Sequence, residues 1–279
     1  MSVSHDSSIA TAAAIRAAEY DAIVVSNDLV NPEYRLLVLD VPPAATQAVP
    51  GQFFHLLCPQ RGQLQPFLRR PMSIFRMDPE SARLAFLYKI TGLGTAAMAA
   101  LTPGEDFNIF GPLGIGFSAP PPGVPIAILA RGVGLATMAP LVPWARERGY
   151  PVTAILSARA PEFLMSVEQM RADGADVLTV TDLEGTSGVE AVEALLENLY
   201  DQGRLGAIYI CGSNRLMLAA QRAAERFQLF GEVAMEQQMA CGLGMCFCCV
   251  RSFRQGGDII HRRVCCEGPV FPLQDALSW

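Results

Sequence analysis

The chain has 279 residues, of which 51% are hydrophobic and 17% are charged, and its formal net charge at pH 7 is −6. This length accommodates two or three small domains, and the composition favours compact folding over disorder. The acidic balance argues against nucleic acid as a partner, because binding to phosphates needs a basic face.

The N-terminal segment carries no signal for export or membrane insertion. No Lys or Arg precedes Arg16, so the basic start of a signal peptide is missing. The most apolar stretch, residues 124–145, is interrupted by Arg131, Pro140 and Pro143. That pattern is typical of a buried strand followed by a helix and not of a membrane span. We therefore expect a cytoplasmic protein in which residues 1–18 form a tail.

Short strand-like runs follow from Tyr20 onward. Turn residues such as Asn31-Pro32 and Pro50-Gly51 separate them. Six short strands at this spacing predict an antiparallel barrel of about 100 residues. The expected strands span residues 21–26, 34–41, 52–58, 72–76, 83–90 and 106–110.

Two motifs in this predicted barrel suit a phosphate-containing ligand. The first is Arg69-Arg-Pro-Met-Ser-Ile74, in which a guanidinium can clamp a pyrophosphate through two parallel hydrogen bonds. Such a run is, however, also typical of a solvated strand edge. The second runs from Leu87 through Gly94 into an expected helix over residues 95–101, where free amides form a seat for phosphate. Within it, Tyr88 either stacks on a ligand or fills the barrel.

After Pro120-Pro-Pro-Gly123 the pattern changes to alternating strands and helices. This alternation predicts a parallel sheet with helices on both faces. The expected strands are 124–130, 152–158, 176–181 and 207–211, and the expected helices are 136–148, 161–172, 189–202 and 215–227. A glycine-rich turn, Ala130-Arg-Gly-Val-Gly-Leu-Ala136, follows the first of these strands but lacks the full G-x-G-x-x-G of a dinucleotide fold. From residue 231 onward we expect one strand and a cysteine segment.

Six of the eight cysteines lie in residues 239–249 and 264–270. Cys241, Cys246 and Cys249 stand at C-x4-C-x2-C, and a further cysteine follows after a gap of hairpin length. This is the plant-type spacing of a [2Fe–2S] cluster, in which one loop supplies three thiolates and a distant residue supplies the fourth.

The spacing leaves some alternatives open. It favours Cys249 over the adjacent Cys248 as a ligand, and it does not decide between Cys265 and Cys266. A zinc site is the main competing interpretation, but zinc ligands usually come as two C-x2–4-C pairs. A disulfide framework is disfavoured because the chain shows no export signal.

Glu236, just before the cysteine loop, either contacts a flavin or caps a turn. The histidines His5, His55 and His261 have no motif partner and are expected to be structural.

Four motifs together resemble a known family. In chain order they are Arg70-Pro-Met-Ser73, Leu87-Tyr-Lys89 with Gly94-Thr95, Gly111-Pro-Leu-Gly-Ile-Gly-Phe117, and the cysteine segment. They resemble the electron-transfer subunit of class 1B dihydroorotate dehydrogenase, a member of the ferredoxin–NADP reductase superfamily with an appended [2Fe–2S] domain. The similarity covers nearly everything from residue 20 to the end, and the ending Arg263-Val-Cys-Cys-Glu-Gly-Pro-Val-Phe271 is its most distinctive part.

The resemblance implies a domain order and a set of sites. It implies an FAD-binding barrel over residues 19–118, an NAD-binding α/β domain over 119–230 and a cluster domain over 231–279. It assigns FAD contacts to Arg70, Pro71, Met72, Ser73, Leu87, Tyr88, Lys89, Gly94 and Thr95. It assigns nucleotide contacts to Gly132, Gly134, Cys211 and Gly212. It assigns the cluster to Cys241, Cys246, Cys249 and Cys265.

The resemblance also implies a function in de novo pyrimidine (UMP) biosynthesis. The chain would be an NAD-linked oxidoreductase subunit without catalytic residues for substrate oxidation. Electrons would pass from the FMN of a dihydroorotate dehydrogenase catalytic subunit through the [2Fe–2S] cluster and FAD to NAD⁺. The implied assembly is a heterotetramer of two catalytic and two electron-transfer subunits.

Some positions depart from the family pattern, and other functions fit the same motifs. Arg131 stands where a glycine is usual, and Ser213 stands where proline is common. Arg159, after the second strand of the α/β part, leaves the choice between NAD and NADP open. One alternative is the small reductase subunit of a bifurcating NADH–ferredoxin:NADP oxidoreductase, a sulfide dehydrogenase or a hydrogenase. Another is a non-catalytic module in which a cluster or zinc only holds the C-terminus.

Overall fold

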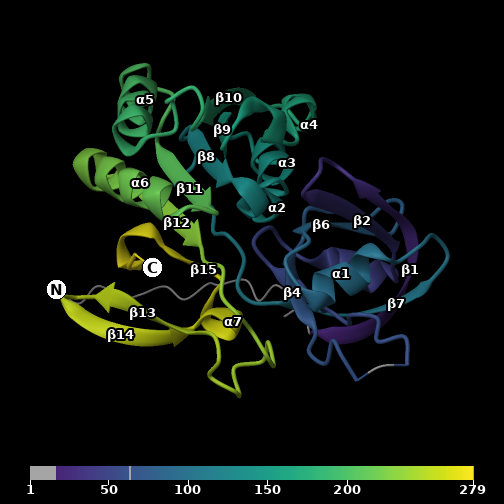
Figure 1. The fold of residues 1–279 in the computed structure, drawn as a ribbon. Helices are drawn as coiled ribbons and strands as arrows, with labels where there is room; N and C mark the ends of the chain where they lie inside the picture. Colours follow the sequence, from purple (N-terminus) through teal and green to yellow (C-terminus); the bar gives the residue numbers. More distant parts are fainter. Residues whose placement is uncertain (1–16, 63, 279) are drawn as a thin grey trace.

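The chain folds into a curled antiparallel sheet, a parallel sheet with flanking helices, and a C-terminal cysteine segment with a hairpin (Figure 1). The computed structural model describes residues 17–62 and 64–278, so most of the predicted tail lies outside the described residues. None of the described helices has the length and apolar character needed to cross a membrane.

The curled sheet has seven strands in the order β4-β3-β7-β1-β2-β6-β5. The strands are β1 (Ala18–Leu29), β2 (Tyr34–Asp40), β3 (Phe53–Leu56), β4 (Arg70–Ser73), β5 (Arg76–Asp78), β6 (Arg83–Lys89) and β7 (Asp106–Leu113). Helix α1 (Leu93–Ala99) follows β6, near the predicted 95–101. All pairings in this sheet are antiparallel, and large apolar side chains such as Phe54, Phe86 and Leu39 fill its interior. The predicted barrel architecture is therefore confirmed.

The strand predicted over residues 72–76 is two strands at opposite edges of this sheet. β4 pairs with β3, whereas β5 pairs with β6. The chain crosses between them at Ile74 and Phe75, whose backbone N–H groups donate to Gln52 (3.4 Å) and Ala85 (2.9 Å). A single bent segment thus joins the two edges and closes the sheet on itself, which a reading of local strand patterns did not anticipate.

The parallel sheet has the order β10-β9-β8-β11-β12, and β15 adds an antiparallel edge. Its strands are β8 (Ile126–Arg131), β9 (Val152–Ala158), β10 (Asp176–Thr181), β11 (Ala207–Cys211), β12 (Phe230–Ala234) and β15 (Val270–Pro272). Its helices are α2 (Leu135–Met138), α3 (Leu141–Glu147), α4 (Val167–Ala172), α5 (Val189–Asp201) and α6 (Asn214–Phe227). Side chains of α2 to α4 pack on one face of the sheet and those of α5 and α6 pack on the other. The predicted two-sided α/β layer is confirmed.

Two predicted helices are shorter than expected. The helix predicted over 136–148 is interrupted between α2 and α3, where Pro140 supplies no backbone N–H and precedes the first residue of α3. The helix predicted over 161–172 begins with a 3₁₀ turn at Pro161–Phe163, and α4 starts only after Ser166, which has a left-handed φ of 60°.

The C-terminal part contains more strands than predicted. β12 and β15 belong to the parallel sheet, so the boundary predicted at residues 230–231 falls inside β12. β13 (Val250–Gln255) and β14 (Asp258–Arg263) form a separate hairpin that leads into α7 (Val264–Glu267). The hairpin turn is Gly256-Gly257, with φ of 58° and 96°. A Gly-Gly pair between two strand-like runs is a recognised two-residue hairpin signal, and the expectation of a single strand overlooked it.

The strand order of the parallel sheet reverses between β8 and β11, and the turns after these two strands meet there. Dinucleotides bind in open α/β sheets at this kind of switch point, beyond the carboxyl ends of the strands. A Cβ added at Gly134 would lie 2.6 Å from the backbone of Cys211 and from the Cα of Gly212. Gly212 itself has a φ of 93°. The two turns can approach so closely only because both positions are glycine.

We predict that Gly134→Ala destabilises the chain by about 2–4 kcal/mol, because the backbone of Cys211 cannot move away from a new methyl group without shifting β11. Chemical denaturation would measure the loss. Gly188→Ala is the matched control, since a Cβ at Gly188 meets nothing within 4 Å. It should cost no more than about 1 kcal/mol. Equal stability of the two variants would contradict the close contact.

Candidate functional site

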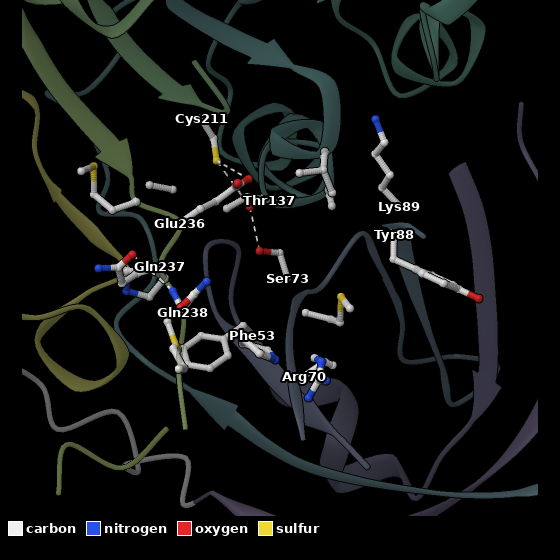
Figure 2. A pocket seen from close by; sticks show the side chains of 18 of the residues that line it. Phe53, Arg70, Ser73, Tyr88, Lys89, Thr137, Cys211, Glu236, Gln237 and Gln238 are labelled. Atoms are coloured by element: carbon white, nitrogen blue, oxygen red, sulfur yellow. Dashed lines mark hydrogen bonds between the residues drawn. The ribbon is translucent and has the colours of Figure 1, made fainter. Parts of the chain in front are cut away.

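A cavity of about 840 Å³ lies where the curled sheet, the carboxyl edge of the parallel sheet and the segment after β12 meet (Figure 2). The volume is within the range of cofactor and small-molecule sites. The residues that line it include Arg69, Arg70, Pro71, Met72, Ser73, Leu87, Tyr88, Lys89, Thr91, Thr95, Val133, Ala136, Thr137, Cys211, residues 234–240, Cys248, Arg251 and Pro269. Three segments far apart in sequence therefore share one space.

Most of the residues predicted to hold a cofactor line this cavity, and the exceptions are four glycines. Gly94, Gly132, Gly134 and Gly212 do not line it. Gly94 nevertheless supports the lining, because a Cβ there would lie 2.5 Å from Nε of Arg70. The guanidinium of Arg70 thus packs flat against the start of α1, and it donates to the carbonyl of Leu68 (2.6 Å).

The ring of Tyr88 packs in the interior of the barrel, although the residue is also part of the cavity wall. Its side chain is fully buried, and its hydroxyl donates to Oδ1 of Asn27 (2.9 Å). Figure 2 shows the ring directed away from Ser73 and Arg70. Burial raises the pKa of the phenol, which therefore stays protonated as the donor. Of the two roles considered for Tyr88, the structure supports the structural one.

A row of polar side chains crosses from the curled sheet to the parallel sheet along the cavity wall. Thr137 of α2 donates to Oγ of Ser73 in β4 (2.8 Å). The thiol of Cys211, at the end of β11, lies 3.7 Å from Oγ1 of Thr137 and 3.9 Å from Oε1 of Glu236. These contacts are drawn as dashed lines in Figure 2. Ser73 and Cys211 were predicted as site residues, whereas Thr137 was not.

The thiol and the carboxyl in this row both hold their protons more firmly than usual. Burial and the neighbouring Glu236 raise the pKa of Cys211 well above its ordinary value. Burial also raises the pKa of Glu236. A protonated thiol and a carboxyl of raised pKa on one wall can donate hydrogen bonds to a ring in the cavity and can store a proton close to it.

The cysteine segment forms another part of the cavity wall, since Met239, Ala240 and Cys248 line it. The loop is pressed against the barrel at Gly242, where a Cβ would lie 2.8 Å from Nε2 of His55. His55 is buried, and its Nε2 has no hydrogen-bond partner among the described residues.

Four of the thiols are arranged as two pairs. Cys241 lies beside Cys246, and Cys249 lies beside Cys265, whose backbone N–H donates to Sγ of Cys249 (3.4 Å). In the described part of the chain, no three His, Cys, Asp or Glu side chains converge closely enough to surround one metal ion. Two separated pairs fit a two-iron cluster, in which each iron takes two protein ligands, better than they fit a single zinc ion.

The environment of the loop favours the thiolate at Cys241 and disfavours it at Cys265. Burial acts to raise the pKa of Cys241, but the backbone N–H groups of Leu243, Cys246 and Met245 and the thiol of Cys246 together lower it to about 6. Burial and the adjacent Cys249 raise the pKa of Cys265. Iron binds the thiolate, so this donor set releases protons when it is loaded.

The neighbouring cysteines have different surroundings. Cys248 is exposed and faces the cavity. Cys266 is partly buried, and a Cβ at Gly244 would lie 2.6 Å from its Sγ. Arg263 holds this part of the loop, because Nη1 donates to the carbonyl of Gly244 (3.1 Å) while Nε donates to Glu267 (2.7 Å).

Three apolar side chains of the cysteine loop project outward. The exposed fractions are 52% for Leu243, 79% for Met245 and 63% for Phe247, which also has a left-handed φ of 57°. Side chains this exposed do not shield a cluster from water. Contact with a partner fits this geometry, and a closed apolar shell around a cluster does not.

Comparison with known proteins supports the interpretation of the cysteine segment as an iron–sulfur domain and shows relatives that match most of the chain. Residues 236–276 match the model of the iron–sulfur cluster binding domain of dihydroorotate dehydrogenase B. A "dihydroorotate dehydrogenase B (NAD(+)), electron transfer subunit" from Desulforamulus reducens is 34% identical over 91% of this chain and 96% of its own length. Proteins of the same name from Bacillus caldolyticus and Streptococcus thermophilus are 31% identical (80% of this chain, 84% of the relative) and 29% identical (90% and 96%).

Solved structures share the fold at lower identity. A structure of an NADH-dependent reduced ferredoxin–NADP oxidoreductase matches with a TM-score of 0.76 and 23% identity, covering 91% of this chain and 88% of that chain. A ferredoxin reductase of carbazole 1,9a-dioxygenase matches with a TM-score of 0.58 and 19% identity, covering 77% and 66%. These likenesses support the architecture of barrel and α/β layer.

We predict that Tyr88→Phe lowers the free energy of unfolding by about 1–2 kcal/mol, because Oδ1 of Asn27 loses a buried donor. Flavin content should stay at the wild-type level, since the ring faces the barrel interior. Tyr200→Phe, at a side chain that is 41% exposed, is the control and should change stability little. Denaturation and the flavin absorbance of the purified proteins would measure both effects. Loss of flavin without loss of stability would assign Tyr88 to the cavity after all.

Proposed function

The chain belongs to the family of dihydroorotate dehydrogenase B electron-transfer subunits, and from this premise we propose that it passes electrons from a flavin-containing catalytic subunit to NAD⁺ in pyrimidine synthesis. Its own cofactors in this proposal are a [2Fe–2S] cluster and FAD. FAD would transfer electrons between the cluster and NAD⁺, because it exchanges electrons with a cluster singly and with a nicotinamide as a hydride pair.

The observation that carries the proposal is the shared cavity. The barrel motif, the end of β11 and the cysteine segment all contribute to its wall. A group bound there is within reach of a nucleotide at the switch point of the parallel sheet and of a cluster in the cysteine loop. That arrangement suits one cofactor placed between two redox partners.

We assign the flavin to the barrel side of this cavity. Arg70 would hold the pyrophosphate, with Gly94 and Thr95 at the start of α1 and residues 71–73 and 87–89 along the walls. Arg70 suits this role because a guanidinium offers two parallel donors to phosphate. The hydroxyls of Ser73 and Thr137, which already bond to one another, would orient the ring of the flavin.

We assign the nicotinamide nucleotide to the carboxyl edge of the parallel sheet. Because Gly132, Gly134 and Gly212 have no side chains, the nucleotide could come close to the backbone there. Cys211 would lie beside the nicotinamide. The high pKa of Cys211 supports this role, because a buried thiol that stays protonated adds no negative charge beside the nicotinamide. The four cluster ligands in this proposal are Cys241, Cys246, Cys249 and Cys265.

A bifurcating reductase subunit is the second candidate, and the fold match with a TM-score of 0.76 is the observation in its favour. Identity to that structure is only 23%, whereas relatives named as dihydroorotate dehydrogenase B subunits reach 34% over nearly their whole length. The first candidate is therefore preferred. The location in the cytoplasm and the heterotetrameric stoichiometry stay predictions.

The partner in this proposal is the catalytic subunit, and the docking surface is the outer side of the cysteine loop. Leu243, Met245 and Phe247 are exposed there. Desolvated aromatic and aliphatic side chains near the centre of an interface supply most of its binding energy. Docking at this loop would also bring the partner's flavin close to the cluster.

The cluster assignment predicts the effect of six single substitutions. Serine at Cys241, Cys246, Cys249 or Cys265 should remove or weaken the cluster, because each position must supply a thiolate. Cys248→Ser and Cys266→Ser are the matched controls and should keep it. Iron content and the paramagnetic resonance signal after reduction would measure the outcome. A normal signal in Cys265→Ser, together with its loss in Cys266→Ser, would move the fourth ligand to Cys266.

The partner assignment predicts the result of reconstitution. With the catalytic subunit, the chain should support dihydroorotate-dependent reduction of NAD⁺, and alone it should not. Leu243→Glu combined with Phe247→Glu should weaken assembly by about 30-fold or more, since two central apolar contacts are lost. Leu29→Glu combined with Leu183→Glu is the control at side chains that are 62% and 73% exposed elsewhere. Turnover by the isolated chain would exclude the proposed division of labour, and unchanged assembly of the first variant would exclude this surface.

A further inference from the structure

The carboxyl edge of the parallel sheet carries three arginines, and each is paired with a carboxylate. Arg131, at the end of β8, donates to Asp182 beyond the end of β10 (2.5 Å). Arg215 of α6 donates to the same Asp182 (2.9 Å). Arg159, immediately after β9, donates to Oε1 of Glu33 (2.5 Å). The first two pairs are made within the α/β layer, but the third is made across to the curled sheet.

Glu33 is held firmly in its position. It lies in the turn between β1 and β2, where Oδ1 of Asn31 accepts hydrogen bonds from the backbone N–H of Glu33 (3.0 Å) and of Tyr34 (3.1 Å). Its second carboxylate oxygen accepts from Nζ of Lys89 (2.7 Å). The hydrogen bonds from Lys89 and Arg159 lower the pKa of this carboxyl, so it is ionised at neutral pH.

Arg159 is held from two sides. Its Cζ lies 3.7 Å from the ring centroid of Phe163, and the carboxylate of Glu33 lies at its end. In a dinucleotide-binding sheet, an arginine beyond the second strand is placed to accept the 2′-phosphate of NADP, whereas NAD presents a hydroxyl at that point. Arg159 thus stands at the specificity position without being free to act as a phosphate ligand.

We infer that Glu33 is a specificity-determining residue that makes this site select NAD over NADP by occupying Arg159. The inference rests on the proposed nucleotide site at the carboxyl edge and adds to it the feature that sets its preference. It also explains how a chain with an arginine at this position serves an NAD-linked reaction.

The negative charge of Glu33 disfavours NADP and not NAD. A 2′-phosphate carries between one and two negative charges near neutral pH, so it must displace the carboxylate of Glu33 or lie beside it. Both alternatives disfavour NADP, since like charges at a few ångströms repel and a displaced Glu33 leaves Arg159 without its partner. A ribose hydroxyl carries no charge, and NAD meets neither obstacle.

The test is Glu33→Gln, which keeps the size of the side chain and removes its charge. We expect the ratio of kcat/KM for NADPH to that for NADH, in reduction of an artificial acceptor, to rise about tenfold. The double variant Glu33→Gln with Arg159→Gln should lose this gain, because the guanidinium that binds the phosphate is gone. Asp173→Asn, which removes a second ion pair between the two layers among the described residues (Arg76 to Asp173, 2.9 Å), is the matched control and should leave the ratio as in the wild type.

A binding measurement separates this inference from the proposed function. Adenosine 2′,5′-bisphosphate contains the 2′-phosphate and needs no flavin chemistry, so calorimetry with this probe tests Glu33 directly. Tighter binding to Glu33→Gln than to wild type supports the inference even if neither coenzyme reduces the flavin, a result that would overturn only the proposed reductase function. Unchanged binding together with an unchanged coenzyme ratio would overturn the inference. So would equal shifts in Glu33→Gln and Asp173→Asn, which would make Glu33 a clamp between layers and nothing more.

Discussion

The contact between Gly242 and the imidazole of His55 is the constraint on which the proposed electron path depends. It presses the cysteine loop onto strand β3 of the barrel, and a side chain at position 242 would hold the loop away. Cys248 and Met239 reach the cavity wall from the same segment. A cluster held by this loop would consequently be a direct neighbour of the cavity that we assign to the flavin.

The parallel sheet meets the cavity through a second set of close contacts. The turns after β8 and β11 are in close contact at Gly134 and Gly212. Cys211, at the end of β11, is part of the cavity wall. Thr137 then joins this edge to Ser73 of the barrel. Ion pairs between the layers, from Glu33 to Arg159 and from Arg76 to Asp173, lie outside the cavity. The cavity wall carries charged residues of its own, namely Arg69, Arg70, Lys89, Glu236 and Arg251, whereas these two ion pairs lie around it.

Local patterns predicted some parts of this structure closely. β9, β10 and β11 have the predicted bounds, because short apolar runs between turn residues leave little choice of period or length. The cysteine spacing indicated an iron–sulfur loop without help from the fold. The choice between Cys265 and Cys266 was open from spacing alone, since adjacent residues differ only in which way their side chains point.

Other parts depend on tertiary structure and were not predictable from local patterns. The segment from Arg70 to Asp78 is one extended run in sequence, yet it forms two strands because the sheet closes around it. Tyr88 belongs to a cofactor-like motif, but strand alternation directs its ring into the barrel. Thr137 enters the site only because α2 packs beside β4. Glu33 lies 126 residues from Arg159, and no local signal joins them.

The central claim is that flavin and cluster are neighbours within this one chain, and their magnetic interaction tests it most directly. Partial reduction should yield molecules that contain both a flavin radical and a reduced cluster. The account predicts that the radical signal in paramagnetic resonance is broadened and relaxes faster than in a preparation of Cys249→Ser that contains no cluster iron. A radical signal identical in the two proteins would contradict the account, because it would place the cluster far from the flavin cavity.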